Sequence, residues 1–217
     1  MKKMMFSALV IASVLSPAVA FAQTEKTKPT TATYITKEEI DLVSQSEQSK
    51  RTSDQNTKVV NLGYENFAVG VIHRASTRNP APQDNAGGGP SGATEPCGRH
   101  MDTLPPGGTP GGIVHDFQTE GYYIISGGGT MFTDGYIVNG RHSTQNDAPG
   151  GPNGPSCGGI AFEVKKVVVK VGDVIIVPPG VVHGWTDIPD HVDYLSFRPS
   201  QEKSSLQAGW VNPTIQK

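Results

Sequence analysis

The sequence predicts an all-β fold: a sandwich, a jelly roll or a barrel. Between residues 58 and 199, short runs rich in Val, Ile and aromatic residues alternate with Gly- and Pro-rich turns, and the whole chain has 26 Gly and 17 Pro. A single helix-start signal precedes these runs, and the runs show no internal repeat. Many short strands with frequent Gly and Pro turns in one chain are typical of these architectures.

The first 22 residues have the pattern of a secretory signal peptide. Lys2 and Lys3 precede an apolar run, and Ala20 and Ala22 supply the small residues of a cleavage site. Ser and Pro interrupt the run too early for a membrane anchor, which needs about 20 apolar residues. We expect cleavage after Ala22 and a periplasmic or secreted protein, with no membrane contact once the signal is cleaved.

The expected mature chain, about 195 residues long, is enough for one domain with a sizeable core. Loss of Lys2 and Lys3 leaves 16 basic against 20 acidic residues. The chain has no basic block and no interleaving of basic and aromatic residues, so the composition argues against a nucleic-acid partner.

A polar lead and a short helix are expected over residues 23–57. Residues 23–33 lack periodicity, as a disordered lead does. Thr36 can act as the N-cap of a helix over residues 37–47, and Glu39 stands at the position that closes a capping box.

Residues 58–200 are expected to form the β-barrel, followed by a C-terminal tail over 201–217. Gly/Pro-rich insertions are expected at 80–112 and 143–160. The uninterrupted apolar run Val174–Val177 predicts a fully buried strand. Strands are expected over 58–64, 66–74, 112–117, 120–127, 129–140, 160–172, 173–178, 181–188 and 192–199.

The two cysteines, Cys97 and Cys157, each lie in a Gly/Pro-rich loop. In an exported protein such a pair is more often a disulfide than a metal site. The alternative is a pair of free thiols.

Three polar residues stand on otherwise apolar strand faces. By period-2 alternation, His115 lies between Ile113 and Phe117, Glu120 shares a face with Tyr122, and His183 shares one with Trp185. An imidazole buried without a partner is costly. One divalent metal ion can satisfy all three groups if the strands line the same cavity. The alternatives are a hydrogen-bonded core histidine at 183 and a His–Glu ion pair without metal.

Two segments resemble the motifs of the cupin superfamily. The second motif, a Gly, five residues, Pro-x-Gly, two residues and a His, is complete in Gly172, Pro178, Gly180 and His183. The first motif is matched in part, by Gly107, His115, Glu120 and Gly127. Ile113 stands where that motif has its first histidine, and Asp187 replaces the Asn that often follows the second motif. The similarity covers roughly residues 107–198.

The resemblance implies a cupin-type double-stranded β-helix, a jelly-roll barrel, with His115, Glu120 and His183 as ligands of a divalent ion (Fe, Mn, Ni, Cu or Zn). Two histidines and one carboxylate match the ligand set of non-haem iron(II) oxygenases. It implies an enzyme acting on a small molecule, with dioxygenase-like oxidation favoured. The alternatives are a metal-dependent lyase or isomerase and a non-catalytic binder of a small molecule or sugar. A homodimer through an edge strand is also expected.

Two further residues are candidate catalytic groups. The alternation of its strand predicts that His73 points inward with Phe67, Val69 and Val71, as a fourth ligand or as a general acid or base. The alternative is a histidine hydrogen-bonded at the barrel rim. Tyr122 shares a face with a ligand and is expected to line the pocket, unless it is plain aromatic core.

Overall fold

The computed structural model describes residues 29–46, 54–78, 95–143, 154–200 and 207–216. The predicted signal peptide lies outside these ranges, as do lead residues 23–28 and residues 80–94 and 144–153 of the two predicted insertions. Within the described ranges, no helix is long and apolar enough to cross a membrane.

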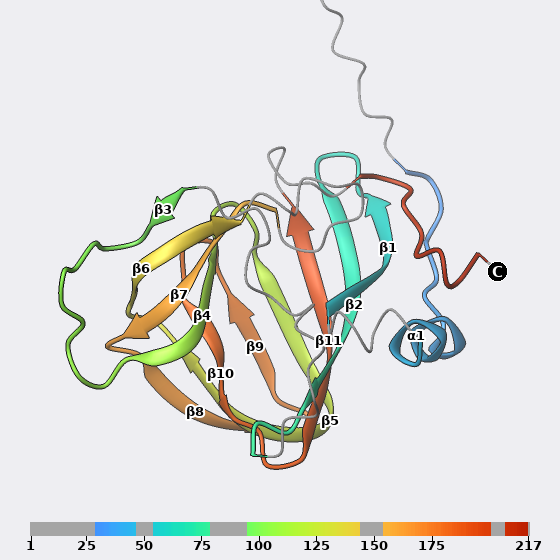
Figure 1. Cartoon of the computed structure of the whole chain (residues 1–217). Helices are drawn as coiled ribbons and strands as arrows, with labels where there is room; N and C mark the ends of the chain where they lie inside the picture. The colour runs from blue at the N-terminus through green and yellow to red at the C-terminus, as the bar shows by residue number, and fades with distance from the viewer. Residues whose placement is uncertain (1–28, 47–53, 79–94, 144–153, 201–206, 217) are drawn as a thin grey trace, which may run out of the picture.

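In the described residues, eleven antiparallel strands form a jelly-roll barrel of two sheets that share one long strand, β5 (Glu120–Thr133) (Figure 1). The first half of β5 lies in a sheet of order β1-β2-β11-β5-β9, completed by β1 (Asp54–Asn61), β2 (Asn66–Ala75), β11 (His191–Ser200) and β9 (Val174–Val177). The second half lies in a sheet of order β8-β5-β10-β4-β7-β6-β3, completed by β8 (Lys165–Lys170), β10 (His183–Asp187), β4 (Thr109–His115), β7 (Ser156–Phe162), β6 (Tyr136–Ser143) and β3 (Pro96–Cys97). The expected all-β fold is confirmed.

Strand β5 changes sheets at a glycine. Gly127 has φ +64°, and a Cβ built on it would lie 2.0 Å from the backbone oxygen of His191. Only glycine fits such a close backbone approach at positive φ. The sequence predicted two strands here, 120–127 and 129–140, and the structure instead joins residues 120–133 into one bent strand.

Strand β9 is half exposed, so the prediction that it is fully buried is wrong. Its pairing with β5 leaves one face outside the barrel, where Val174 and Ile176 are 66 % and 64 % exposed. Ile175 and Val177 face the core. An unbroken apolar run cannot distinguish a strand covered on both faces from one with an apolar outer face.

Helix α1 (Lys37–Ser44) packs against β1 and β2, beside the barrel (Figure 1). It begins as predicted, with Thr36 as N-cap and Glu39 completing a capping box, and it ends at residue 44 rather than 47. The Glu39 carboxylate also lies 2.7 Å from Lys58 Nζ on β1. On the same side of the molecule, Trp210 of the C-terminal segment packs on Val59 and Ala68.

Candidate metal centre

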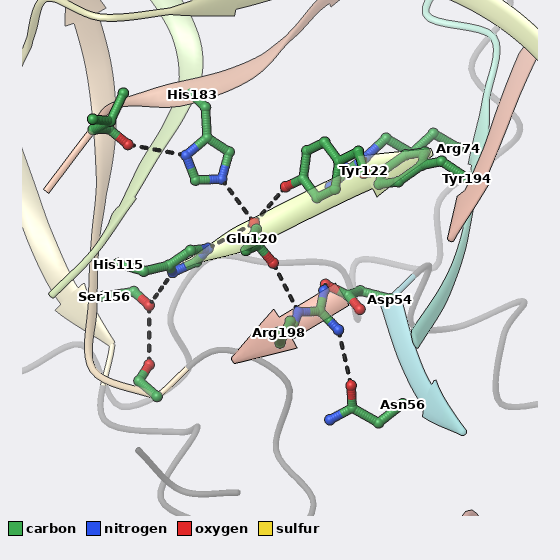
Figure 2. A network of polar contacts seen from close by, with 12 residues as sticks. Asp54, Asn56, Arg74, His115, Glu120, Tyr122, Ser156, His183, Tyr194 and Arg198 are labelled. Atoms are coloured by element: carbon green, nitrogen blue, oxygen red, sulfur yellow. Dashed lines mark hydrogen bonds and ion pairs between the residues drawn. The ribbon is translucent and has the colours of Figure 1, made fainter. Parts of the chain in front are cut away.

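Three predicted ligands, His115, Glu120 and His183, meet inside the barrel (Figure 2). They stand at the end of β4, the start of β5 and the start of β10, and their side chains are 2–5 % exposed. Glu120 Oε2 lies 3.3 Å from His115 Nε2 and 3.1 Å from His183 Nε2. One oxygen and two imidazole nitrogens therefore surround a common point.

The local sequence explains why these residues meet. His183 pairs with Ile113 on β4, two residues before His115, so both histidines lie on the inner face of neighbouring strands. The turn that precedes β10 contains Gly180 at φ +79°, and its N–H donates to the carbonyl oxygen of His115 at 2.9 Å. The Pro-x-Gly turn thus ties one histidine strand to the other.

Hydrogen bonding fixes the tautomer of His115. Ser156 Oγ donates to the carbonyl oxygen of Gly154 at 2.9 Å, so the hydroxyl proton is already used. The His115 Nδ1 that lies 2.7 Å from Ser156 Oγ must therefore carry the hydrogen and donate it. In the neutral ring, Nε2 is then the bare nitrogen, and it points at Glu120.

The second histidine is oriented in the same way. His183 Nδ1 lies 3.1 Å from the carbonyl oxygen of Val181, which can only accept. Its Nε2 is therefore also bare in the neutral ring and faces Glu120. With a proton on Nε2, each histidine forms an ion pair with Glu120 Oε2; without that proton, a cation among the three atoms satisfies both lone pairs and the carboxylate oxygen. This donor set can hold a divalent metal ion, and the backbone or hydroxyl contact on each Nδ1 is the usual support of a metal-ligating histidine.

The other Glu120 oxygen, Oε1, accepts from Arg198 Nε at 2.8 Å (Figure 2). Burial raises the pKa of the Glu120 carboxyl, but attraction to the Arg198 guanidinium opposes burial, and that pKa lies well below its usual range. Glu120 is therefore a carboxylate whose Oε1 is engaged by Arg198 and whose Oε2 faces the histidines.

Arg198 is completely buried and has further partners on β1. Its guanidinium donates to Asn56 Oδ1 at 2.9 Å and to Asp54 Oδ2 at 2.6 Å. Sequence reasoning missed this residue. Its available signal was period-2 alternation in β11, where Tyr194, Ser196 and Arg198 share the inner face, but a lone arginine near a strand end is usually solvated.

The motif residues thus stand at one barrel site, with Gly172, Pro178 and Gly180 shaping the turns around β9 and His183 entering the interior. The structure has the two-sheet, double-stranded β-helix architecture that the resemblance implied. At position 113 the chain departs from the first cupin motif in structure as well as in sequence. Ile113 is partly buried opposite His183, and it supplies no ligand where that motif has a histidine.

No protein-family model matches the chain, and no curated protein matches its sequence. Among solved structures, a cupin protein from Bacteroides fragilis is similar at 15 % identity, over 67 % of this chain and 72 % of that chain, with a TM-score of 0.31. A Klebsiella pneumoniae protein with a double-stranded β-helix domain is 13 % identical (69 % and 81 % covered, TM-score 0.33). Hydroquinone 1,2-dioxygenase from Sphingomonas sp. TTNP3 is 9 % identical (71 % and 74 %, TM-score 0.30).

His73 does not join the candidate metal centre, and its predicted inward direction is wrong. Its side chain is 50 % exposed, with Nδ1 2.6 Å from Asp193 Oδ1. The next residue, Arg74, instead points inward, and its Nε donates to Tyr194 Oη. Because α1 packs against β1 and β2, residues on both faces of β2 are buried, such as Val71 and Ile72. Alternation alone then cannot tell which face is inner.

Tyr122 lies at the cupin site, and its hydroxyl donates to Glu120 Oε2. Burial, reinforced by the Glu120 carboxylate, raises the pKa of the Tyr122 phenol well above its usual range, so the phenol remains a donor. Trp185 packs instead on the apolar core, with its ring 5.8 Å from that of Tyr194.

The predicted disulfide between Cys97 and Cys157 is confirmed. It joins β3 to β7, and Cys157 directly follows Ser156. A pocket of about 310 Å³ lies beside it, lined by His142, Arg99 and Val114 among others. This pocket is distinct from the metal centre, because His115 faces the barrel interior while Val114, the preceding residue, faces the pocket.

Proposed function

We propose that this chain is an exported, metal-dependent cupin enzyme that acts on a small organic molecule, with oxygen-dependent oxidation as the favoured chemistry. One observation carries the proposal: each Nδ1 is held by a neighbouring acceptor, and His115 Nε2 and His183 Nε2 both converge on Glu120 Oε2.

A divalent ion held by this set supplies Lewis-acid chemistry and, if it is iron or copper, redox chemistry. The chain's own residues orient and insulate it. Ser156 and the Val181 carbonyl hold the rings, Arg198 holds one carboxylate oxygen, and the near-complete burial of the three ligands excludes bulk water. Tyr122 Oη, beside Glu120 Oε2, is the nearest phenolic proton donor and remains our candidate acid.

The test is metal content of the purified mature protein, with His115→Ala and His183→Ala as variants and His73→Ala as matched control. We expect about one ion per chain, lost in the first two variants and kept in the third, because His73 lies on the outer face. A chelator should lower the melting temperature of proteins that hold the metal, the wild type and His73→Ala, and leave that of His115→Ala and His183→Ala unchanged. A folded wild-type protein that binds no divalent ion contradicts the proposal.

Metal identity separates the alternatives. Iron or copper, together with substrate-dependent oxygen uptake, supports oxidation. Nickel, manganese or zinc with turnover in the absence of oxygen supports a lyase or isomerase. A bound metal and a bound small molecule without turnover of either kind support a non-catalytic binder.

We also propose export, since residues 1–22 carry the signal pattern and the disulfide is of the kind that persists in oxidising compartments. The mass of the protein recovered from a periplasmic or culture fraction checks this, and a chain that retains residues 1–22 there contradicts cleavage.

We further propose that the chain pairs with a second copy through β9. Val174, Ile176 and Tyr123 expose apolar side chains on adjoining strands, and β9 pairs with β5 alone among the described strands. An isologous contact of two such edges covers both apolar faces and pairs their backbones. Light scattering should give a dimer for the wild type and a monomer for Val174→Lys/Ile176→Lys.

A further inference from the structure

We propose that Arg198 makes the metal centre selective for small organic anions, such as a carboxylate or an enolate, over neutral molecules of the same shape. The inference rests on the proposed metal site and deepens it by assigning the charge of the ligand. It is carried by the burial and the ion pairs of Arg198.

The first step is the neutralisation of Glu120. Its carboxylate is 2 % exposed and lies 2.8 Å from Arg198 Nε, and Arg198 is itself fully buried. A buried ion pair at this distance interacts strongly because little water screens it. The Arg198 guanidinium therefore offsets the negative charge that Glu120 offers to a metal ion.

The two remaining buried charges have opposite signs. Asp54, 16 % exposed, adds one negative charge beside Arg198 at 2.6 Å. Arg74, inside the barrel against Tyr194, adds one positive charge. As ligands of a metal ion the two histidines are neutral imidazoles and add no charge. With or without Arg74, a divalent ion leaves the centre with net positive charge.

Uncompensated charge in a buried site is unfavourable, and an anion bound beside a metal ion held by these residues would remove it. A neutral ligand of equal size cannot. The chemistry of the site thus identifies an organic anion, bound through oxygen, as the preferred ligand.

Gln118 supplies an independent sign of a polar ligand. It is 1 % exposed, and neither Oε1 nor Nε2 of its amide has a hydrogen-bond partner. In the extended segment that leads into β5, Gln118 shares a face with Glu120 and Tyr122. Buried amides are rarely left unpaired, so a free donor and a free acceptor on this face fit a bound carboxylate with its ordered water.

The wild-type protein tests the proposal directly. The protein is loaded with Co²⁺, and acetate and acetamide, which are close in shape, are titrated against its visible spectrum. We expect acetate to bind at least roughly tenfold more tightly, as a charged contact does relative to a neutral one. Equal dissociation constants for the two probes overturn the proposal.

Two variants assign the effect to Arg198. Arg198→Lys keeps the charge and should keep the preference for acetate. Arg198→Gln removes the charge while retaining a donor for Glu120, and it should reduce the preference to about twofold or less while Co²⁺ binds roughly tenfold more tightly. A variant that had lost its structure would bind acetate, acetamide and Co²⁺ all more weakly. A smaller preference for acetate together with tighter Co²⁺ binding therefore reports the loss of charge. An unchanged preference in Arg198→Gln contradicts the role of Arg198.

The outcomes separate this inference from the proposed function. If Co²⁺ does not bind, or binds equally well to His183→Ala, the metal site itself is wrong. If Co²⁺ binds in a His183-dependent way and acetate and acetamide remain equivalent, the metal site stands and only the anion preference is wrong.

Discussion

Each candidate histidine presents Nε2 to the centre because one neighbour occupies its Nδ1. For His115 the neighbour is a side chain, Ser156, and for His183 it is the carbonyl oxygen of Val181. A backbone oxygen persists whatever residue stands at 181. The Ser156 hydroxyl, by contrast, can be removed by a single substitution, so it is the point at which the orientation of a ligand can be tested.

Ser156→Ala should weaken Co²⁺ binding by about 10- to 100-fold, the usual effect of losing the partner of a ligating histidine. The variant leaves His115 Nδ1–H without its acceptor, and the ring is free to turn. Dissociation constants from competition with a chelator measure the change. Ser196→Ala is the matched control, because Ser196 is also fully buried and its Oγ has no partner. Equal affinities in the two variants contradict the role of Ser156.

Among the elements, β5 depends most on one backbone position. Gly127 combines φ +64° with a Cβ position only 2.0 Å from the His191 oxygen, at the point where the strand leaves one sheet for the other. Glycine at a strand bend of this kind marks a close backbone approach.

Gly127→Ala should lower the free energy of unfolding by more than about 2 kcal/mol, because left-handed backbone strain alone costs an alanine roughly 1–2 kcal/mol and the clash adds to it. Urea unfolding measures the loss. Gly158→Ala on β7 is the control: its added Cβ would come no closer than 3.8 Å to a neighbouring atom, and we expect a change within about 1 kcal/mol. A wild-type midpoint for Gly127→Ala contradicts this account of the bend.

At the scale of the whole molecule, the disulfide joins segments that the chain separates by 60 residues. Closing such a loop stabilises the fold by about 4 kcal/mol in the chain-entropy model. Cys97→Ser/Cys157→Ser should therefore unfold at markedly lower urea concentration than the oxidised wild type. Reductant should bring the wild type to the same midpoint and leave the variant unchanged. A reductant effect on the variant would show a cause other than the disulfide.

The features that could be predicted from the sequence are those defined by short, fixed spacings between residues. Each is a motif with a fixed spacing: the Pro-x-Gly turn before His183, the His115 and Glu120 pair, and the capping box of Thr36 and Glu39. Arg198 and Ser156 were missed because each bonds a partner on a neighbouring strand that is 78 or 41 residues away in the sequence. The direction of His73 was misjudged because a helix packs outside its strand, and the exposure of β9 because apolar residues occupy both of its faces.

Because β5 is a member of both sheets, neither sheet can separate from the barrel without breaking hydrogen bonds to this strand. Strands β9 and β11 flank its first half, and β8 and β10 flank its second. Release of either sheet removes hydrogen bonds from the same strand. We therefore expect the amide hydrogens in the middle of β5 to exchange with solvent mainly when the entire domain opens, and Glu120 is the residue that begins this strand.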